Sequence, residues 1–271
     1  MDWTEKVVLI TGGSAGLGRA TADAFARRGA SLVLVARNPD RLEQTASVLR
    51  QQGTKVLCLA TDVTKESAGA EVIARTCDQY GRLDVLVNNV GRSARASVVD
   101  TSVDDFNDLM QTNFLPIVRF SRAAIPSLQQ TQGCIVNIGS LASKSVGLYL
   151  GAYPVTKYAV AAYSTQLRLE LANRGIHVLL VCPGPIARGD AGERYDEQVT
   201  ALPSSAKRPG AGVRLGLLSP DQIAHQLIDS VETRRAELIM PTKARWFFAL
   251  AQLFPRWGDR ILRNRFKQQE A

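Results

Sequence analysis

The chain has 271 residues, 45% of them hydrophobic, and carries a net charge of +8 with a pI near 9.6. This length suits a single α/β domain with a sizeable core. No apolar run approaches the roughly 18 residues of a membrane span, so neither a transmembrane helix nor a signal peptide is indicated. The four cysteines are far apart, and three fall in apolar runs, which indicates buried thiols without a metal or disulfide pattern. We therefore expect a cytoplasmic protein.

The positive charge is concentrated near the C-terminus. Residues 243–267 contain seven lysines and arginines and a single aspartate, a local balance of +6. An excess confined to a tail does not describe a nucleic-acid-binding domain, although it fits an anionic surface. No nucleic-acid partner is expected.

Short apolar runs alternate with amphipathic segments along the chain. Strands are expected at residues 6–11, 31–36, 55–61, 83–89, 133–139, 176–182 and 237–240. Helices are expected at residues 19–28, 39–52, 66–80, 102–130, 153–173 and 219–234. This alternation predicts an α/β fold of the Rossmann type, a doubly wound, seven-stranded parallel sheet with helices on both faces.

Two departures from regular alternation stand out. Pro116 lies inside the helix expected at residues 102–130 and cannot bond the carbonyl of Thr112. It predicts a bend beside Asn113, which is either a tolerated proline kink or a means of freeing polar groups to hold water. Residues 187–218 mix glycines and prolines with polar residues, which predicts a substrate lid. We expect one domain over residues 1–242 and a basic, aromatic helical extension over residues 243–271.

The first predicted strand runs into a glycine-rich turn, GGSAGLG at residues 12–18, and then into a helix. Glycine lets the backbone approach a pyrophosphate, and the helix N-terminus offers free N–H groups. The alternative is a tight strand-to-helix turn without a ligand. The second strand ends at Arg37, 19 residues after Gly18, and no carboxylate precedes Asp40. Because an arginine here accommodates a 2′-phosphate, NADP(H) is favoured over NAD(H), unless Arg37 is only an exposed side chain.

Tyr153 and Lys157 stand four positions apart at the start of a predicted helix, and so share one face. A cation near a phenol lowers the pKa of the phenol, which then exchanges a proton closer to neutral pH. The same spacing also fits a solvated helix face. Asn89 ends one predicted strand and Ser140 follows another, at the edge where open α/β sheets bind ligands. The alternative for Asn89 is an amide that only closes the turn.

Together these features resemble the short-chain dehydrogenase/reductase family. The resemblance covers residues 6–240 and rests on TGGSAGLG at residues 11–18, NNVG at 88–91, Asn113, Ser140, YPVTK at 153–157 and PGPI at 183–186. It implies catalysis by four residues. Tyr153 would be the acid/base for the carbonyl oxygen, and Ser140 would hydrogen-bond the same oxygen. Lys157 would hold the nicotinamide ribose and lower the pKa of the phenol, and Asn113 would anchor a water in a proton relay.

The resemblance also implies a set of cofactor-binding residues. These would be Gly12, Ser14, Gly16, Leu17 and Gly18 around the pyrophosphate and adenosine, Asp62 and Val63 at the adenine, Asn89 and Gly91 on the ribose side, and Ile186 at the nicotinamide, together with Arg37, Tyr153 and Lys157. Three positions depart from the family pattern. Val90 replaces the usual alanine, Arg188 replaces a threonine that often contacts the carboxamide, and Pro154 occupies a first helical turn, where its missing N–H costs little.

The residues thus predict an NADP(H)-dependent oxidoreductase that interconverts a ketone and a secondary alcohol. A lipid, steroid or oxoacyl compound is the candidate substrate, and the resemblance implies a homodimer or homotetramer. The alternative is a non-catalytic dinucleotide-sensing protein on the same fold. The complete set of four catalytic residues argues against it, because a sensor has no need of the tyrosine.

The tail permits two interpretations. Phe247, Leu250, Ala251 and Phe254 share one helical stripe beside the basic cluster. Aromatic side chains next to arginines fit a helix that lies in a membrane interface, and hence peripheral membrane contact. The alternative is a helix packed on its own domain or on a neighbouring subunit, and the sequence favours this interpretation.

Overall fold

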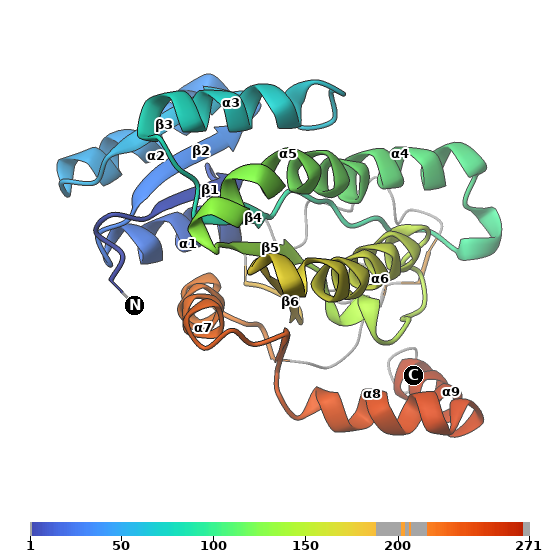
Figure 1. The fold of residues 1–271 in the computed structure, drawn as a ribbon. Coiled ribbons are helices and arrows are strands. Elements are labelled where there is room, and N and C mark those ends of the chain that lie inside the picture. Colours follow the sequence, from blue (N-terminus) through green and yellow to red (C-terminus); the bar gives the residue numbers. More distant parts are fainter. Residues whose placement is uncertain (1, 188–201, 204–205, 207–215, 268–271) are drawn as a thin grey trace.

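Within the residues described by the computed structural model (2–187, 202–203, 206 and 216–267), seven parallel strands form one sheet (Figure 1). Their order across the sheet is β3-β2-β1-β4-β5-β6-β7. The strands are β1 (Val7–Thr11), β2 (Ser31–Ala36), β3 (Val56–Ala60), β4 (Val85–Asn88), β5 (Cys134–Ile138), β6 (His177–Pro183) and β7 (Glu237–Met240). The expected doubly wound parallel sheet is confirmed, with strand ends shifted by one or two residues.

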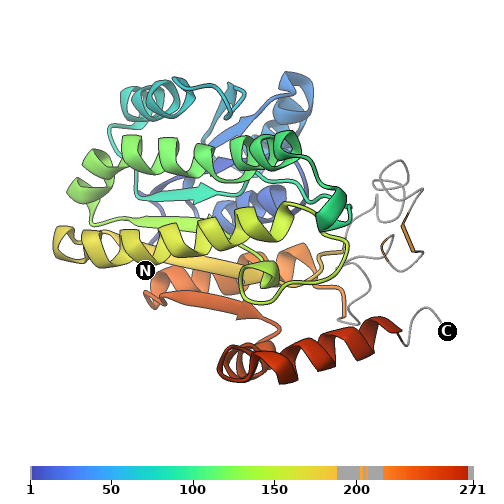
Figure 2. The ribbon, with the colours of Figure 1, turned by 90° about the vertical axis from the view of Figure 1, so that its right-hand side faces the viewer.

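Helices cover both faces of the sheet (Figures 1 and 2). One face carries α1 (Gly16–Ala26), α2 (Pro39–Gln51) and α7 (Pro220–Glu232), and the other carries α3 (Ala68–Tyr80), α5 (Leu115–Thr131) and α6 (Tyr153–Leu171). The remaining helices are α4 (Val103–Asn113), α8 (Ala244–Leu253), α9 (Pro255–Lys267) and the short η1 (Val98–Asp100), η2 (Leu141–Ser143) and η3 (Ala172–Arg174). Because both faces are covered, all residues of β1, β4 and β5 are buried.

The helix expected at residues 102–130 is interrupted beside Asn113. Helix α4 ends at Asn113, α5 begins at Leu115, and Phe114 between them has φ −121° and ψ −55°. Pro116 lacks the N–H that a continuous helix needs at this point. The predicted bend is confirmed, and it divides the segment into two helices. At its start, Ser102 and Asp105 form a capping box.

The C-terminal segment forms a helical hairpin. Helix α8 lies against β7, and α9 lies against α8, at the outer side of the molecule (Figures 1 and 2). A Cβ atom on Gly258 would lie 2.9 Å from Ala251 Cβ, so the two helices approach most closely where one of them has no side chain. In the part of the chain that the structure describes, no helix is both long and apolar enough to cross a membrane. Most of the expected lid at residues 187–218 lies outside the described residues.

Candidate active site

The carboxyl ends of the central strands bring most of the expected site residues to one edge of the sheet. β1 leads into the turn at Gly12, β4 is followed by Asn89, and β5 is followed closely by Ser140. Helix α6 begins with Tyr153, and its N-terminal turn contacts this edge through Lys157. Residues from four distant parts of the chain thus meet at the edge where parallel sheets bind ligands.

Lys157 is the most buried charged group of this edge. Its side chain is only 4% exposed, and Nζ donates a hydrogen bond of 2.8 Å to the carbonyl oxygen of Ile138. Burial lowers the pKa of Lys157 to about 8, although the neighbouring Cys182 acts in the opposite direction. Nζ lies 5.9 Å from the centroid of the Tyr153 ring. Below pH 8, therefore, a buried cation stands beside the half-buried tyrosine.

Asn113 makes hydrogen bonds with all parts of its amide. Oδ1 accepts from the backbone N–H of Arg92 at 2.8 Å, while Nδ2 donates to the carbonyl of Arg92 at 2.8 Å and to Thr156 Oγ1 at 3.1 Å. The side chain thereby joins the loop after β4 to the first turn of α6. Gly91 lies in the same cluster, because a Cβ there would be 3.3 Å from Asn113 Oδ1 and 3.4 Å from Lys157 Nζ. The Asn113 amide is thus occupied in fixing backbone, a role that its isolated position in the sequence did not reveal.

Ser140 is half-buried at the end of β5 and is oriented by a short helical turn. Its Oγ accepts a hydrogen bond from the N–H of Ala142 at 3.1 Å, and its own N–H donates to Ser143 Oγ at 3.1 Å. A hydroxyl that accepts from a backbone N–H keeps its own proton for donation. Ser140 is therefore held in place as a hydrogen-bond donor.

A buried polar chain supports the site from behind, and the sequence analysis did not find it. Asn88 Nδ2 donates to Asn137 Oδ1 at 2.9 Å and to Ser121 Oγ at 3.3 Å, and Asn137 Nδ2 donates to Ser164 Oγ at 2.9 Å. Strands β4 and β5 are thereby tied to α5 and α6. Side chains with satisfied buried hydrogen bonds hold rigid positions, so this chain fixes the helix that carries Tyr153 relative to the sheet.

The glycine-rich turn has a backbone that only glycine accommodates at its closest point. A Cβ on Gly18 would lie 2.1 Å from the carbonyl oxygen of Gly12, and Gly12 and Gly16 have φ of +69° and +51°. Nothing lies within 4 Å of a Cβ built on Gly16. Helix α1 begins at Gly16, Leu17 is buried beneath it, and Ser14 precedes it. Open space beside Gly16, together with the free N–H groups of a helix N-terminus, fits the pyrophosphate of a dinucleotide.

Asn89 holds this turn against β4. Its Nδ2 donates to the carbonyl of Thr11 at 2.9 Å and to that of Gly12 at 3.4 Å, while its N–H donates to Thr11 Oγ1 at 3.0 Å. The amide of Asn89 is therefore engaged by the turn itself. Thr11, which the sequence analysis did not assign a role, is the hydroxyl that joins the ends of β1 and β4.

Arg37 and Asp62 follow the ends of the adjacent strands β2 and β3. The Asp62 carboxylate accepts hydrogen bonds from Thr64 N–H at 3.0 Å and Thr64 Oγ1 at 2.8 Å, and these bonds lower its pKa, with a further contribution from the Arg37 charge. Arg37 is exposed, and Val63 is buried. The structure thus places an exposed guanidinium near an ionised carboxylate at the edge where the resemblance implied the adenosine end.

The remaining expected residues flank this edge. Ile186 is half-buried and pairs with Leu218 in a parallel bridge, which brings the two ends of residues 187–218 together. Pro154 lies in the first turn of α6, as expected. Val90 packs against the core on the α3, α5 and α6 side. Arg188 lies outside the described residues.

Arg95 joins the loop after β4 to residue 206. The Arg95 side chain is buried, and its Nε donates to the carbonyl of Ala206 at 2.9 Å. Nη1 donates to Ser93 Oγ at 2.7 Å and to the carbonyl of Ala94 at 2.9 Å. The sequence analysis did not find this contact, because local sequence does not indicate which distant carbonyl an arginine will bond.

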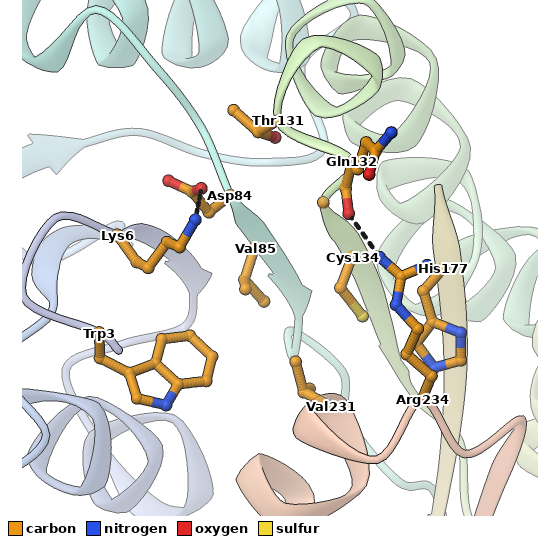
Figure 3. Close-up of a pocket in the computed structure, with 11 residues that line it drawn as sticks. Trp3, Lys6, Asp84, Val85, Thr131, Gln132, Cys134, His177, Val231 and Arg234 are labelled. Carbon is orange, nitrogen blue, oxygen red and sulfur yellow. Dashed lines mark hydrogen bonds and ion pairs between the residues drawn. The ribbon is translucent and has the colours of Figure 1, made fainter. Parts of the chain in front are cut away.

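A cavity of about 40 Å³ lies at the opposite edge of the sheet (Figure 3). It is lined by Val85, Cys134 and His177, the first residues of β4, β5 and β6, and by Lys6 and Arg234 among others. A volume of this size holds one to a few waters. It is too small for a dinucleotide, and so the carboxyl edge remains the candidate active site.

Comparisons with known proteins agree with this fold. The profile of the family described as short chain dehydrogenase matches residues 6–199. Ketoacyl reductase HetN of Nostoc sp. is 29% identical over 267 residues, covering 96% of this chain and 89% of HetN. A short chain dehydrogenase/reductase from Burkholderia phymatum, solved in complex with NAD, has a TM-score of 0.84 at 24% identity, with 95% of this chain and 96% of that chain covered.

A second solved structure is L-sorbose reductase from Gluconobacter frateurii, in complex with NADPH and L-sorbose. It has a TM-score of 0.76 at 28% identity and covers 88% of this chain and 96% of that chain. The parallel sheet with its glycine-rich turn is the architecture of a dinucleotide-binding fold. The chain belongs to the short-chain dehydrogenase/reductase family and is an enzyme of that family.

Proposed function

We propose that this enzyme interconverts a ketone and a secondary alcohol with NADP(H), and that Tyr153 is its acid/base. The observation that carries the proposal is the pairing of a half-buried tyrosine with a buried lysine, whose Nζ is 5.9 Å from the ring centroid, at the carboxyl edge of the sheet. A neighbouring cation favours the ionised phenol and moves its pKa toward neutral pH. Tyr153 then donates a proton to the substrate oxygen during reduction and removes it during oxidation.

Ser140 and Tyr153 share the substrate oxygen in this proposal. Ser140 Oγ already accepts from Ala142 N–H, so its hydroxyl proton points elsewhere and serves as a second donor. A preoriented donor stabilises charge that develops on the oxygen without reorganising in the transition state. Ser140 thus stabilises charge, and Tyr153 moves the proton.

Lys157 and Asn113 position these groups. The Lys157 ammonium is anchored to the Ile138 carbonyl, and it keeps two further N–H donors for a ribose hydroxyl. Because the Asn113 amide is bonded to Arg92 and Thr156, we assign it the role of fixing the first turn of α6. The side-chain amide of Asn113 is already hydrogen-bonded. A water of a proton relay would therefore bond to the backbone carbonyl beside the break between α4 and α5.

The glycine-rich turn and Arg37 would hold the cofactor. Gly12, Ser14, Gly16, Leu17 and Gly18 form the open cradle, and Asp62, Val63, Asn89, Gly91 and Ile186 follow the ends of the other strands. When bound, the nicotinamide supplies or accepts the hydride. An exposed arginine after β2, in place of a carboxylate, supports preference for the 2′-phosphate of NADP(H). The solved neighbours hold either form of the cofactor: L-sorbose reductase was solved with NADPH and the Burkholderia phymatum protein with NAD. The proposed preference therefore rests on Arg37.

The substrate class that we propose is an oxoacyl or other apolar ketone, including lipid and steroid ketones. Its support is the similarity to a protein named ketoacyl reductase along 96% of this chain. L-Sorbose reductase, in contrast, was solved with a sugar and not with an apolar ketone. A carbonyl panel that contains oxoacyl thioesters, steroid ketones and ketoses separates these classes.

We further propose a homodimer or homotetramer in the cytoplasm. Helix α6 exposes Val155, Tyr158 and Leu169 on its outer side, which supports contact with a second copy. The buried thiols of Cys134 and Cys182 are uncrosslinked, which supports a reducing compartment. Sedimentation of the purified protein gives the number of copies, and replacing Leu169 by Ser would lower it.

The substitution Tyr153→Phe tests the proposed function. We expect kcat/KM for NADPH-dependent ketone reduction to fall by roughly 10²-fold or more, while NADPH binding stays near normal. Tyr158→Phe removes a hydroxyl from the same helix outside the site and serves as the matched control. Turnover of a folded Tyr153→Phe protein at the level of the control would refute the assignment.

A further inference from the structure

Helix α8 has apolar side chains on two opposite sides. Phe248 is buried and packs with Val160 and Ile239 of the main body. Trp246, Leu250 and Leu253 on the other side are 76%, 44% and 71% exposed. Their spacing of four and three residues makes one stripe along the helix. The packing of α8 on β7 therefore accounts for one side only.

The exposed stripe differs from the one expected from sequence. Of the four residues Phe247, Leu250, Ala251 and Phe254, the structure turns two into the hairpin. Phe247 is half-buried, with its ring centroid 6.0 Å from that of Trp257, and Ala251 packs against Gly258. Contact with α9 therefore covers part of the predicted stripe. Leu250 and Phe254 remain exposed.

Exposed basic side chains occur on both helices of the hairpin. Arg245 of α8 and Arg256, Arg260 and Arg263 of α9 are all exposed. The three arginines of α9 recur at spacings of four and three residues, so they share one face. In the part of the chain described by the structure, none of these arginines has an ion-pair partner. Asp259 is the single carboxylate between residues 243 and 267.

We propose that the α8–α9 hairpin binds the surface of an anionic lipid bilayer. The C-terminal surface, as we name it, consists of the exposed apolar residues Trp246, Leu250, Leu253, Phe254 and Trp257 with the exposed arginines Arg245, Arg256, Arg260 and Arg263. Tryptophan and phenylalanine prefer the boundary between headgroups and acyl chains. Exposed arginines are attracted to the negative surface potential of an anionic leaflet. The hairpin lies in the interface and does not cross it.

Charge favours a lipid surface over a second copy of the chain. In a twofold-symmetric dimer the same patch occurs on both subunits. Each patch belongs to a segment with a local charge of +6, so such a contact would bring two strongly basic surfaces together. An anionic bilayer instead neutralises the arginines while it covers the aromatic side chains. The inference concerns only this hairpin and does not depend on the reaction catalysed.

Co-sedimentation of the full chain with vesicles tests the inference. Vesicles of phosphatidylcholine alone are compared with vesicles that contain phosphatidylcholine and phosphatidylglycerol in equal amounts. We expect binding to the anionic vesicles, weak binding to the neutral ones, and loss of binding at high salt. Arg256→Gln with Arg260→Gln, and separately Trp246→Ser with Leu253→Ser, should each lower the partition coefficient roughly tenfold or more.

Matched controls come from exposed residues elsewhere in the chain. Val99→Ser replaces a more exposed apolar side chain on η1, and Arg75→Gln with Arg174→Gln removes two exposed charges from other helices. These controls should bind vesicles like the unchanged protein. Failure of the unchanged protein to bind anionic vesicles, or equal binding by the hairpin variants, would overturn the inference. A lower mass of Trp246→Ser with Leu253→Ser in sedimentation would also overturn it, since a second copy would then cover the surface.

Discussion

At the amino edge of the sheet, charged side chains meet partners from their own chain. Asp84 is 4% exposed and accepts hydrogen bonds from Val7 N–H and from Arg82, with Lys6 Nζ 3.2 Å away. His177 Nε2 lies 2.9 Å from the carbonyl oxygen of Arg235, and Arg234 donates to that of Gln132 (Figure 3). At the carboxyl edge, in contrast, Lys157 is buried without a carboxylate beside it in the described part of the chain.

The comparison assigns stability to the amino edge of the sheet and chemistry to its carboxyl edge. Paired charges at the amino edge hold β1 to β4, and their cavity of about 40 Å³ accommodates only water. At the carboxyl edge, burial without a counter-charge in the described part of the chain lowers the pKa of Lys157. The glycine-rich turn at the same edge has open space beside Gly16. Perturbed groups of this kind mark functional sites. Substitutions at the carboxyl edge should therefore lower kcat/KM, and substitutions at the amino edge should lower the free energy of unfolding.

The largest expected effect comes from Lys157→Met. Removing the buried cation leaves the Tyr153 phenol without its electrostatic neighbour, and we expect kcat/KM to fall by roughly 10²- to 10³-fold. Lys55→Met, an exposed lysine before β3, is the control and should retain activity. Circular dichroism confirms that the variant is folded. Unchanged kcat/KM in a folded Lys157→Met protein would contradict a catalytic role for the carboxyl edge.

Asp84→Asn should act on stability instead. The asparagine cannot balance Arg82 and Lys6, and we expect the free energy of unfolding to drop by about 2 kcal/mol, a value reduced by the partial exposure of both cations. Urea unfolding measures it, with the exposed Asp78→Asn as control. kcat/KM at a temperature where the variant is folded should stay within about twofold of the unchanged protein. A large loss of activity without loss of stability would contradict the division.

A smaller effect is expected for Arg37→Asp. The carboxylate repels a 2′-phosphate and accepts from a ribose hydroxyl, so the ratio of kcat/KM for NADPH to that for NADH should fall roughly tenfold or more. Arg174→Asp changes the net charge equally at the amino end of β6 and is the control. An unaltered ratio in Arg37→Asp would show that Arg37 does not recognise the cofactor.

The smallest effect is a pH dependence of stability. The pKa of Lys157 is about 8 in the folded chain against an ordinary value of 10.5. Above pH 8 the folded state therefore binds fewer protons than the unfolded state, and stability rises with pH by up to about 1.4 kcal/mol per pH unit. Unfolding of the unchanged protein and Lys157→Met should diverge between pH 8 and 9, before the cysteines, of ordinary pKa 9.0, ionise in the unfolded chain. Parallel curves would contradict the lowered pKa.

Most of the fold follows from local sequence, since strands buried on both faces read as continuous apolar runs. The positions of Ser140 and Asn89 were predictable because parallel strands bring their carboxyl ends to one edge. The position of Lys157 beside Tyr153 was predictable from helical spacing. In each case one rule of regular geometry connects the position in the sequence to the position in space.

Contacts between distant segments escaped prediction. Asn113 bonds with Arg92 and Thr156, which lie 21 and 43 residues away, and Arg95 bonds with Ala206, 111 residues away. No periodicity encodes such pairs. The packing of α9 on α8 escaped prediction for a similar reason, because it depends on the close approach of Gly258 to Ala251.

The division between the two edges is tested most directly by measuring two quantities on two variants side by side. For Tyr153→Phe and Asp84→Asn, we would determine kcat/KM with NADPH and a reducible ketone, and the free energy of unfolding in urea. We expect Tyr153→Phe to lose roughly 10²-fold or more in kcat/KM with stability within about 0.5 kcal/mol, and Asp84→Asn to show the reverse pattern. If both variants lost activity only in proportion to lost stability, the assignment of Tyr153 as the acid/base would be contradicted.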